Sequence, residues 1–295
     1  MKFEIFDERI AVLGESPFAF GSDNSEISWA DILGSRVLTR NLVTNQTSEF
    51  STEENVGFAI RTASGGFVLG TNSGPVLRDA NGDVQRLFSL QEVDPLTKSH
   101  RIRWNDAKVS PNGNLFLGTM AYSMLPKTST LFQYNPESEE LGVLLPDLQI
   151  SNGMDWSDDG NTFYFIDSGT QSVRAYSTMN DVLGESREVI TIESEDGAPD
   201  GMCMDAEGGL WVALWKGGEV RRYDTLNNFE LSAKITLPAP YITSCAFAGK
   251  DLDTLIITSA TDGETGLPPE SGMTFLAKPG VKGRPSRLYP GGSNE

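Results

Sequence analysis

The sequence predicts an all-β fold, a six-bladed β-propeller with four-stranded antiparallel blades around a central channel. Short apolar runs typical of strands begin 40 to 48 residues apart, at 27–30, 67–70, 115–118, 163–166, 210–213 and 255–258. A period of this length is typical of propeller blades. Four of these runs follow a polar turn that contains glycine, at 64–66, 112–114, 159–161 and 207–209. No long amphipathic helix pattern is evident between them.

Each repeat is expected to hold about four short strands. A glycine turn supplies the positive φ that a tight hairpin needs, and a second loop and strand follow each run, as at 218–223. One small twisted sheet cannot bury both of its faces alone, so the sheets should pack around one axis. We therefore expect residues 1–295 to form a single domain. The two ends of the chain should complete one blade together.

The composition limits the classes of partner. The 295-residue chain carries a formal net charge of −18, and 38% of its residues are hydrophobic. A charge of this sign repels nucleic-acid phosphates and anionic lipid headgroups, so we expect neither a nucleic acid nor a membrane as partner. The charge favours solubility and is also compatible with a bound cation. The sequence leaves the oligomeric state open.

The cellular location is expected to be the cytoplasm. The start of the chain lacks the apolar segment of a signal peptide, and no run of about 18 apolar residues indicates a membrane span. Cys203 and Cys245 are expected to be small residues inside strands. Two cysteines in a chain of this size do not indicate a disulfide framework.

A single histidine, His100, excludes two kinds of hydrolytic site. A Ser-His-Asp triad would have to use this residue, and the G-x-S-x-G motif of a nucleophile elbow is missing. A zinc site with two or three histidine ligands is excluded as well. Hydrolysis by this chain would therefore depend on carboxylates and other oxygen ligands.

Three polar residues recur in register with the predicted blades. Asn105, Asn152 and Asp200 precede the next apolar run by 10, 11 and 10 residues. Equivalent positions in successive blades lie on one ring around the axis, so these side chains should be neighbours on loops at the channel mouth. A cluster of oxygen ligands without histidine suits Ca²⁺, Mg²⁺ or Mn²⁺.

Each of these residues also has an ordinary explanation. Asn152 precedes a glycine and Asp200 lies in a Pro-Asp-Gly segment, and both patterns are common in turns. Arg103 and Asn105 share one face of an extended segment, but the same segment could form an Asn-Asp turn with an ion pair to Asp106. Glu15, between glycine and a Ser-Pro pair, could be a solvated turn residue.

Seven segments, in order across nearly the whole chain, resemble one family, which includes senescence marker protein 30 (regucalcin), gluconolactonase and the luciferin-regenerating enzyme. They are 13–17 (Leu-Gly-Glu-Ser-Pro), 103–106 (Arg-Trp-Asn-Asp), 151–153 (Ser-Asn-Gly), 165–168 (Phe-Ile-Asp-Ser), 199–202 (Pro-Asp-Gly-Met), 210–213 (Leu-Trp-Val-Ala) and the pair 243–247 and 255–259.

The resemblance implies a metal-dependent lactonase that hydrolyses sugar lactones of the gluconolactone or pentonolactone type to aldonic acids. It implies that Glu15, Asn152 and Asp200 bind one divalent metal ion, and that Asp200 is also the catalytic acid and base. Arg103 and Asn105 would bind substrate oxygens. The ion would be Ca²⁺ in the first instance, with Mg²⁺, Mn²⁺, Zn²⁺ and Fe²⁺ as alternatives.

One departure from the family pattern concerns specificity. Some members carry a substrate-binding glutamate shortly after Gly-Thr-Met, whereas here Gly118-Thr119-Met120 is followed by Ala121 and Tyr122. Tyr122 is therefore predicted to contact the substrate, and the identity of the sugar stays open. The segment 262–272 is expected to be a mobile loop near the site.

Two other functions stay open at this stage. The first is a calcium-dependent hydrolase of the arylesterase or phosphotriesterase kind on the same scaffold. The second is a non-catalytic metal-binding or protein-interaction propeller. The set Arg103, Asn105, Asn152 and Asp200 is more polar than a packing surface needs, which argues against the second. A panel of lactones, aryl esters and organophosphates would separate these functions.

Overall fold

The computed structural model describes residues 1–291 and shows an all-β chain. Two four-stranded sheets come first: β2 (Gly14–Phe20), β3 (Glu26–Asp31), β4 (Arg36–Asn41) and β5 (Thr47–Ser51), then β6 (Val56–Arg61), β7 (Phe67–Thr71), β8 (Gly74–Arg78) and β9 (Val84–Arg86). Two more follow: β10 (Ile102–Val109), β11 (Leu115–Ala121), β12 (Ser129–Tyr134) and β13 (Leu141–Leu148), then β14 (Ser151–Trp156), β15 (Thr162–Asp167), β16 (Ser172–Met179) and β17 (Val182–Thr191).

The remaining strands form one sheet of eight. It comprises β18 (Ala198–Met204), β19 (Gly209–Trp215), β20 (Glu219–Asp224) and β21 (Glu230–Thr236), and then β22 (Tyr241–Ala248), β23 (Thr254–Ala260), β24 (Thr274–Ala277) and β1 (Phe3–Asp7). These two groups of four are joined only through the pair Trp215–Tyr241 between β19 and β22. All strand pairs within the sheets are antiparallel, which confirms the predicted all-β class and four-stranded antiparallel pattern.

Helices contribute little to the described part of the chain. One short α-helix, α1 (Leu90–Val93), and three 3₁₀ turns, Pro95–Lys98, Ser168–Thr170 and Ser194–Asp196, connect strands. No helix among residues 1–291 has the length and apolar character needed to cross a membrane.

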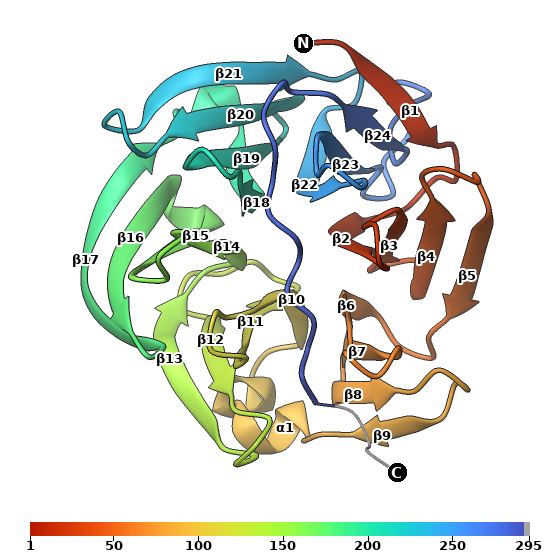
Figure 1. Cartoon of the computed structure of the whole chain (residues 1–295). Coiled ribbons are helices and arrows are strands. Elements are labelled where there is room, and N and C mark those ends of the chain that lie inside the picture. The colour runs from red at the N-terminus through yellow and green to blue at the C-terminus, as the bar shows by residue number, and fades with distance from the viewer. Residues whose placement is uncertain (292–295) are drawn as a thin grey trace.

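The sheets are arranged in a ring, with the first strand of each group nearest the centre (Figure 1). These inner strands are β2, β6, β10, β14, β18 and β22. Each contacts the next around the ring, and β22 contacts β2. Equivalent positions in different sheets therefore face a common axis.

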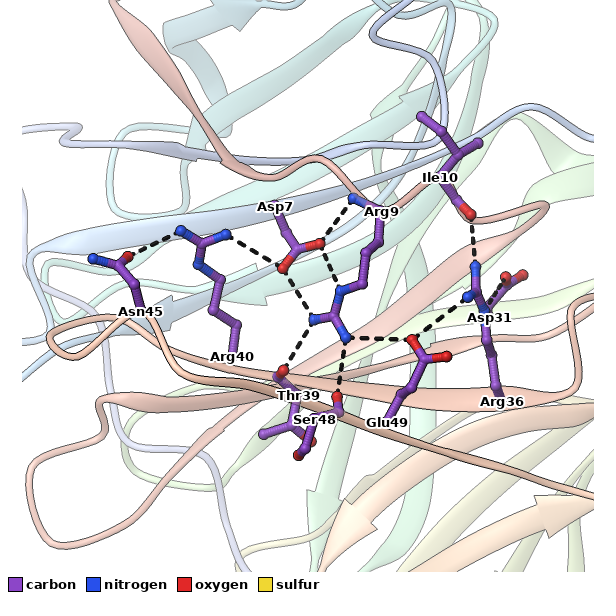
Figure 2. Close-up of polar contacts among 10 residues, drawn as sticks. All are labelled: Asp7, Arg9, Ile10, Asp31, Arg36, Thr39, Arg40, Asn45, Ser48 and Glu49. Atoms are coloured by element: carbon purple, nitrogen blue, oxygen red, sulfur yellow. Dashed lines mark hydrogen bonds and ion pairs between the residues drawn. The ribbon is translucent and has the colours of Figure 1, made fainter.

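The first and the last strand of the chain complete one group of strands together, as the sequence predicts. β1 pairs with β24, and Arg9 then ties this group to the sheet that follows (Figure 2). Its guanidinium pairs with the buried Asp7 carboxylate at 2.9 Å, and donates to the carbonyls of Thr39 in β4 at 2.9 Å and Ser48 in β5 at 3.0 Å. Arg40 also approaches Asp7, at 3.5 Å. One arginine thus links strands on both sides of the ring closure.

Aromatic side chains fill the core. Trp29, Trp156 and Trp211 are fully buried. Trp104, which lies between Arg103 and Asn105 in the sequence, is 0% exposed and packs edge-to-face on Phe132 at 5.8 Å. It is therefore a core residue.

The two cysteines lie on adjacent inner strands, Cys203 on β18 and Cys245 on β22. Both are buried free thiols, with their sulfur atoms 3.5 Å apart. The expectation that they are small residues inside strands is confirmed.

The C-terminal segment, residues 278–291, crosses one face of the ring (Figure 1). The carbonyl of Lys282 accepts from Ala206 at 2.8 Å, and the buried Tyr289 exchanges backbone hydrogen bonds with Arg61 and Ala63 on the far side, at 2.9 Å each. Between them Arg284 donates to the carbonyl of Trp156 at 2.6 Å. We call this segment the strap, and it covers one end of the central channel.

Candidate metal and substrate site

The candidate site lies where the pairing of the inner strands with their neighbours is interrupted by bulges. Asn105, Asn152 and Asp200 are each the first residue after a break in the ladder of β10, β14 and β18. Such bulges redirect a side chain without ending the strand, and they are common beside active sites. The predicted register of the three residues is confirmed.

Their predicted placement on loops is wrong, because all three lie within inner strands. The physical reason is that a bulge and a tight turn favour the same residues, since both need an irregular backbone. The Asn-Gly pair that suggested a turn forms the bulge of β14. The Asp-Gly pair of the Pro-Asp-Gly segment forms the bulge of β18, and the proline precedes it.

The site lies at the opposite end of the channel from the strap. Asn152 is near the start of β14, whereas Arg284 of the strap contacts Asp155 and Trp156 at its end. Four residues of extended chain separate these positions by roughly 13 Å. A channel cavity lies between them, and its lining includes Asp106 on the side of the site and Arg284 on the side of the strap.

Glu15 joins the site from β2. It is 5% exposed and is the last residue before the break in that strand, where Ser16 adopts a positive φ of 49°. The amide of Ser16 donates to its carboxylate at 3.0 Å. Burial raises the pKa of the Glu15 carboxyl well above its usual value, and the charges of Asp200 and Asp106 raise it further. Asp200 and Asp106 therefore lie near enough to Glu15 for their charges to act on it.

Asp200 is 6% exposed and has no ion-pair partner within 4.0 Å among residues 1–291. Burial raises the pKa of its carboxyl well above the usual value; Asp106 raises it too, while the Asn152 amide and the Arg103 charge lower it. Asp200 is thus near enough to Asn152 and to Glu15 for each pair to affect a carboxyl pKa, which is consistent with a common site for the three predicted metal ligands.

Asn152 presents an oxygen atom without a partner. Its amide nitrogen donates to Ser168 Oγ at 3.0 Å, and that hydroxyl donates to the carbonyl of Pro199 at 2.7 Å. Its Oδ1 is buried and accepts no hydrogen bond from residues 1–291. Burying a hydrogen-bond acceptor without a partner costs free energy, so a ligand bound to this oxygen would remove that cost. Together with two buried carboxylates it forms an oxygen donor set that fits a hard divalent cation.

This donor set differs from a cluster of acidic side chains. Within residues 1–291, no group of three or more His, Cys, Asp or Glu side chains is arranged to hold a metal ion. The candidate set has two carboxylates and one amide. Asp106, which sequence reasoning considered only as an ion-pair partner of Arg103, instead accepts from the amide of Ala107 at 2.7 Å.

Arg103 and Asn105 form a rigid pair beside the donor set. Arg103 is 5% exposed, and its Nη1 donates to Asn105 Oδ1 at 2.6 Å and to the carbonyl of Trp104 at 3.0 Å. The amide nitrogen of Asn105 donates to the carbonyl of Ser151 in β14 at 2.8 Å. The Asn105 side chain is therefore locked between two inner strands, with its oxygen accepting from Arg103.

Tyr122 lies next to this pair, directly after β11. Its hydroxyl contacts Asn55 Oδ1 at 2.6 Å and Asn72 Oδ1 at 3.3 Å, and the Arg103 guanidinium carbon lies 5.9 Å from the centre of its ring. The structure thus places the last predicted site residue at the same end of the channel. Asp262 is near enough to raise the pKa of Arg103, against the effect of burial. The segment 262–272 therefore begins near the site, as expected.

Sequence reasoning missed one position of the same ring. Gly57 is the first residue after the break in β6, and a Cβ atom there would lie 2.3 Å from the carbonyl oxygen of Trp104. Only glycine lets β6 approach β10 this closely. An isolated glycine inside the apolar run 56–60 is the signal that could have revealed it.

Comparisons with known proteins identify the family of this chain. Residues 13–261 match the family model described as the SMP-30/Gluconolactonase/LRE-like region. The chain belongs to this family. The resemblance deduced from the sequence is therefore confirmed. The family match includes all six predicted site residues but excludes β1, β24 and the strap.

Individual relatives cover nearly the whole chain. Regucalcin of Danio rerio is 38% identical over 287 residues, 95% of each chain. YvrE of Bacillus subtilis, provisionally named a sugar lactone lactonase, is 33% identical over 260 residues, 85% of each chain. The crystal structure of regucalcin from Agrobacterium tumefaciens, named as a calcium-binding protein, superposes with a TM-score of 0.89 at 26% identity and covers 98% of this chain and 97% of its own.

Proposed function

We propose that this protein is a metal-dependent lactonase that opens sugar lactones of the gluconolactone or pentonolactone type to aldonic acids. The observation that carries the proposal is the buried oxygen set at the bulges, with the unpartnered Asn152 Oδ1 beside the Glu15 and Asp200 carboxyls. The provisional name of the Bacillus subtilis relative supports the substrate class.

The proposed scaffold is one domain, residues 1–295, with six blades. Counting the sheet of eight as two blades is supported by its single joining pair, Trp215–Tyr241. Six inner strands that contact each other in a closed ring also support this count. Each blade would then contribute one bulge to the mouth of the channel.

Glu15, Asn152 and Asp200 would hold the ion. A bound divalent cation supplies a Lewis acid that polarises a lactone carbonyl and lowers the pKa of water. Ca²⁺ is the first choice because its ligands are oxygen atoms in flexible geometry, and because the Agrobacterium tumefaciens relative is named as calcium-binding. Mg²⁺, Mn²⁺, Zn²⁺ and Fe²⁺ are the other ions to test.

The residues of this chain would then carry the proton transfers. Asp200 accepts a proton from the attacking water and delivers it to the ring oxygen as the ester bond breaks. Its desolvated position and raised pKa suit both steps. Proton transfer by a positioned group of this kind contributes about 10²–10⁴-fold in rate.

Substrate binding would fall to Arg103, Asn105 and Tyr122. Arg103, held by Asn105, places buried positive charge where a tetrahedral oxygen develops negative charge. Tyr122, fixed by two asparagines of the neighbouring sheet, forms one wall for the sugar ring. A small sugar lactone is thus the proposed partner, and no nucleic acid or membrane is expected.

The test is hydrolysis of a panel of aldonolactones by metal-stripped protein, with each divalent ion added back. We expect no turnover without metal and recovery with at least one ion, Ca²⁺ first. Aryl esters and organophosphates should be poorer substrates than the lactones. Turnover that is unchanged by chelator and by added metal would contradict the proposal.

A further inference from the structure

A second arginine lies at the rim of the site without a partner. Arg101 immediately precedes β10, so by strand alternation it shares a face with Arg103 and Asn105. Its side chain is exposed and makes no ion pair or side-chain hydrogen bond within residues 1–291. Its guanidinium carbon lies 4.2 Å from the centre of the Tyr122 ring. The positive charge is therefore positioned by stacking and left available for a ligand.

The Tyr122 ring on which Arg101 stacks is fixed from two directions. Its backbone amide donates to the carbonyl of Arg101 at 3.0 Å. Its hydroxyl is held by Asn55 and Asn72 at 2.6 and 3.3 Å, and Asn55 in turn donates to Ser35 Oγ at 3.0 Å. The platform under the guanidinium is thus built from neutral groups of two sheets.

Neighbouring carboxylates are engaged elsewhere. Glu54, next to Asn55, accepts from both the amide and the hydroxyl of Ser73, at 2.6 and 2.7 Å. Asp262 acts electrostatically on Arg103, yet it lies beyond ion-pair distance of either arginine. The Arg101 guanidinium therefore stacks on the Tyr122 ring with no carboxylate paired to it among residues 1–291.

We propose that Arg101, stacked on Tyr122 at the rim of the site, binds an exocyclic anionic group of the substrate. Resting on the lactonase function proposed above, this assigns the substrate class as acidic sugar lactones, which carry a carboxylate or phosphate at the end remote from the reacting carbonyl. A guanidinium group matches both anions in bidentate geometry.

The spacing along β10 supports this assignment. Alternate residues of an extended strand lie roughly 6.6 Å apart. Asn105 donates to the carbonyl of Ser151, the residue before Asn152 in β14, Arg103 comes next, and Arg101 lies outermost. A lactone with its carbonyl at the oxygen donor set would extend its far substituent outward along this row.

The experiment compares lactones that differ only in the remote group. The kcat/KM values of glucono-1,5-lactone, its 6-phosphate and a glucaric acid lactone are measured with wild type, Arg101→Met and Arg187→Met. Arg187→Met is a matched control, because Arg187 is exposed and lies 5.6 Å from the Phe229 ring on an outer strand.

We expect wild type to favour a charged lactone, and added salt to lower kcat/KM for that substrate. Arg101→Met should lower the ratio of charged to neutral kcat/KM by about tenfold to a hundredfold, the usual effect of losing a hydrogen bond to a charged group. Arg187→Met should leave the ratio unchanged. The better of the two anions identifies carboxylate or phosphate as the ligand. An unchanged ratio in Arg101→Met would overturn the inference.

Failure of the lactonase function would be recognised separately, since then no lactone is hydrolysed with any metal. The anion subsite is in that case decided by calorimetric titration with glucarate, gluconate 6-phosphate and gluconate. Tighter binding of glucarate or gluconate 6-phosphate, which carry a second anion at C6, than of gluconate, lost in Arg101→Met, supports the subsite. Equal binding of all three acids overturns it.

Discussion

Asn152 and Asp200 occupy the same position on neighbouring inner strands, each the first residue after the break in strand pairing. The Asn152 side chain contacts the Asp200 carboxyl and lowers its pKa, against the effects of burial and of Asp106. Its own Oδ1 stays without a hydrogen-bond partner within residues 1–291. The Asn152 amide thus acts on the Asp200 carboxyl and also offers an oxygen atom to a ligand, and the proposed site depends on this combination.

The proposed role of Asp200 in proton transfer can be tested separately from its proposed role in metal binding. Asp200→Asn keeps an oxygen atom and the size of the side chain but cannot accept a proton. We expect kcat for lactone hydrolysis to fall about 10²–10⁴-fold, while bound metal, measured by atomic emission, is partly retained. Turnover near that of wild type would rule out Asp200 as the base.

Gly57 is predicted to maintain the close approach of β6 to β10. Gly57→Ala places a Cβ atom 2.3 Å from the carbonyl oxygen of Trp104, beside Asn105. Overpacking of this kind lowers the free energy of unfolding by about 1–3 kcal/mol, and the shift of β10 should also reduce kcat. Denaturant unfolding and lactone kinetics measure both effects.

The control for that change is Gly142→Ala in β13, where an added Cβ meets no atom within 4 Å. This variant should keep wild-type activity and stability. If Gly57→Ala behaved in the same way, the close approach would have no bearing on the site.

Arg9 is predicted to stabilise the closure of the ring. Arg9→Met removes its bonds to Asp7, Thr39 and Ser48 and leaves the buried Asp7 carboxylate with Arg40 at 3.5 Å. We expect the free energy of unfolding to fall by about 1–3 kcal/mol, as measured by denaturant titration. Arg174→Met, which loses an exposed hydrogen bond to Ser186, is the control. Equal stability of the two variants would contradict this role.

The ion pair between Asp155 and Arg284 of the strap should make the free energy of unfolding decrease at acid pH. Burial raises the pKa of its carboxyl, but Lys108 at 2.9 Å and Arg284 of the strap at 3.3 Å outweigh burial, so the pKa is lowered. A carboxyl with a lowered folded pKa stabilises the fold above its unfolded pKa, about 3.9 for aspartate. That contribution is lost as the pH falls through the folded pKa.

Asp155→Asn should therefore lower the free energy of unfolding by about 1–3 kcal/mol at pH 7, with the difference from wild type shrinking below pH ~4. Asp158→Asn is the control, because Asp158 faces the same Arg284 at 3.7 Å but is 96% exposed. Unfolding curves at several pH values measure both. A difference from wild type that is independent of pH would show that the Asp155 charge contributes nothing.

The register of the site could be predicted from sequence because each inner strand carries one bulge at an equivalent place. Asn105, Asn152 and Asp200 therefore recur at the blade period. Their location in strands could not be predicted, since an Asn-Gly pair has the same local preference in a bulge as in a turn.

Other features depend on contacts between distant segments. Glycine is required at position 57 only because β10 approaches it closely. Arg101 is positioned by stacking on Tyr122, 21 residues further along the chain. The strap reaches across the ring to Arg61 and Trp156. No local pattern carries this information, because it arises from the way the blades close on one another.

Calcium titration of the metal-stripped protein by calorimetry tests the central claim most directly, with wild type, Glu15→Gln, Asn152→Ala and the control Arg187→Met. We predict one binding site per chain in wild type and in Arg187→Met, and a loss of affinity of at least about tenfold in the other two. Wild-type affinity in both Glu15→Gln and Asn152→Ala would contradict the account, since the cation would then bind elsewhere.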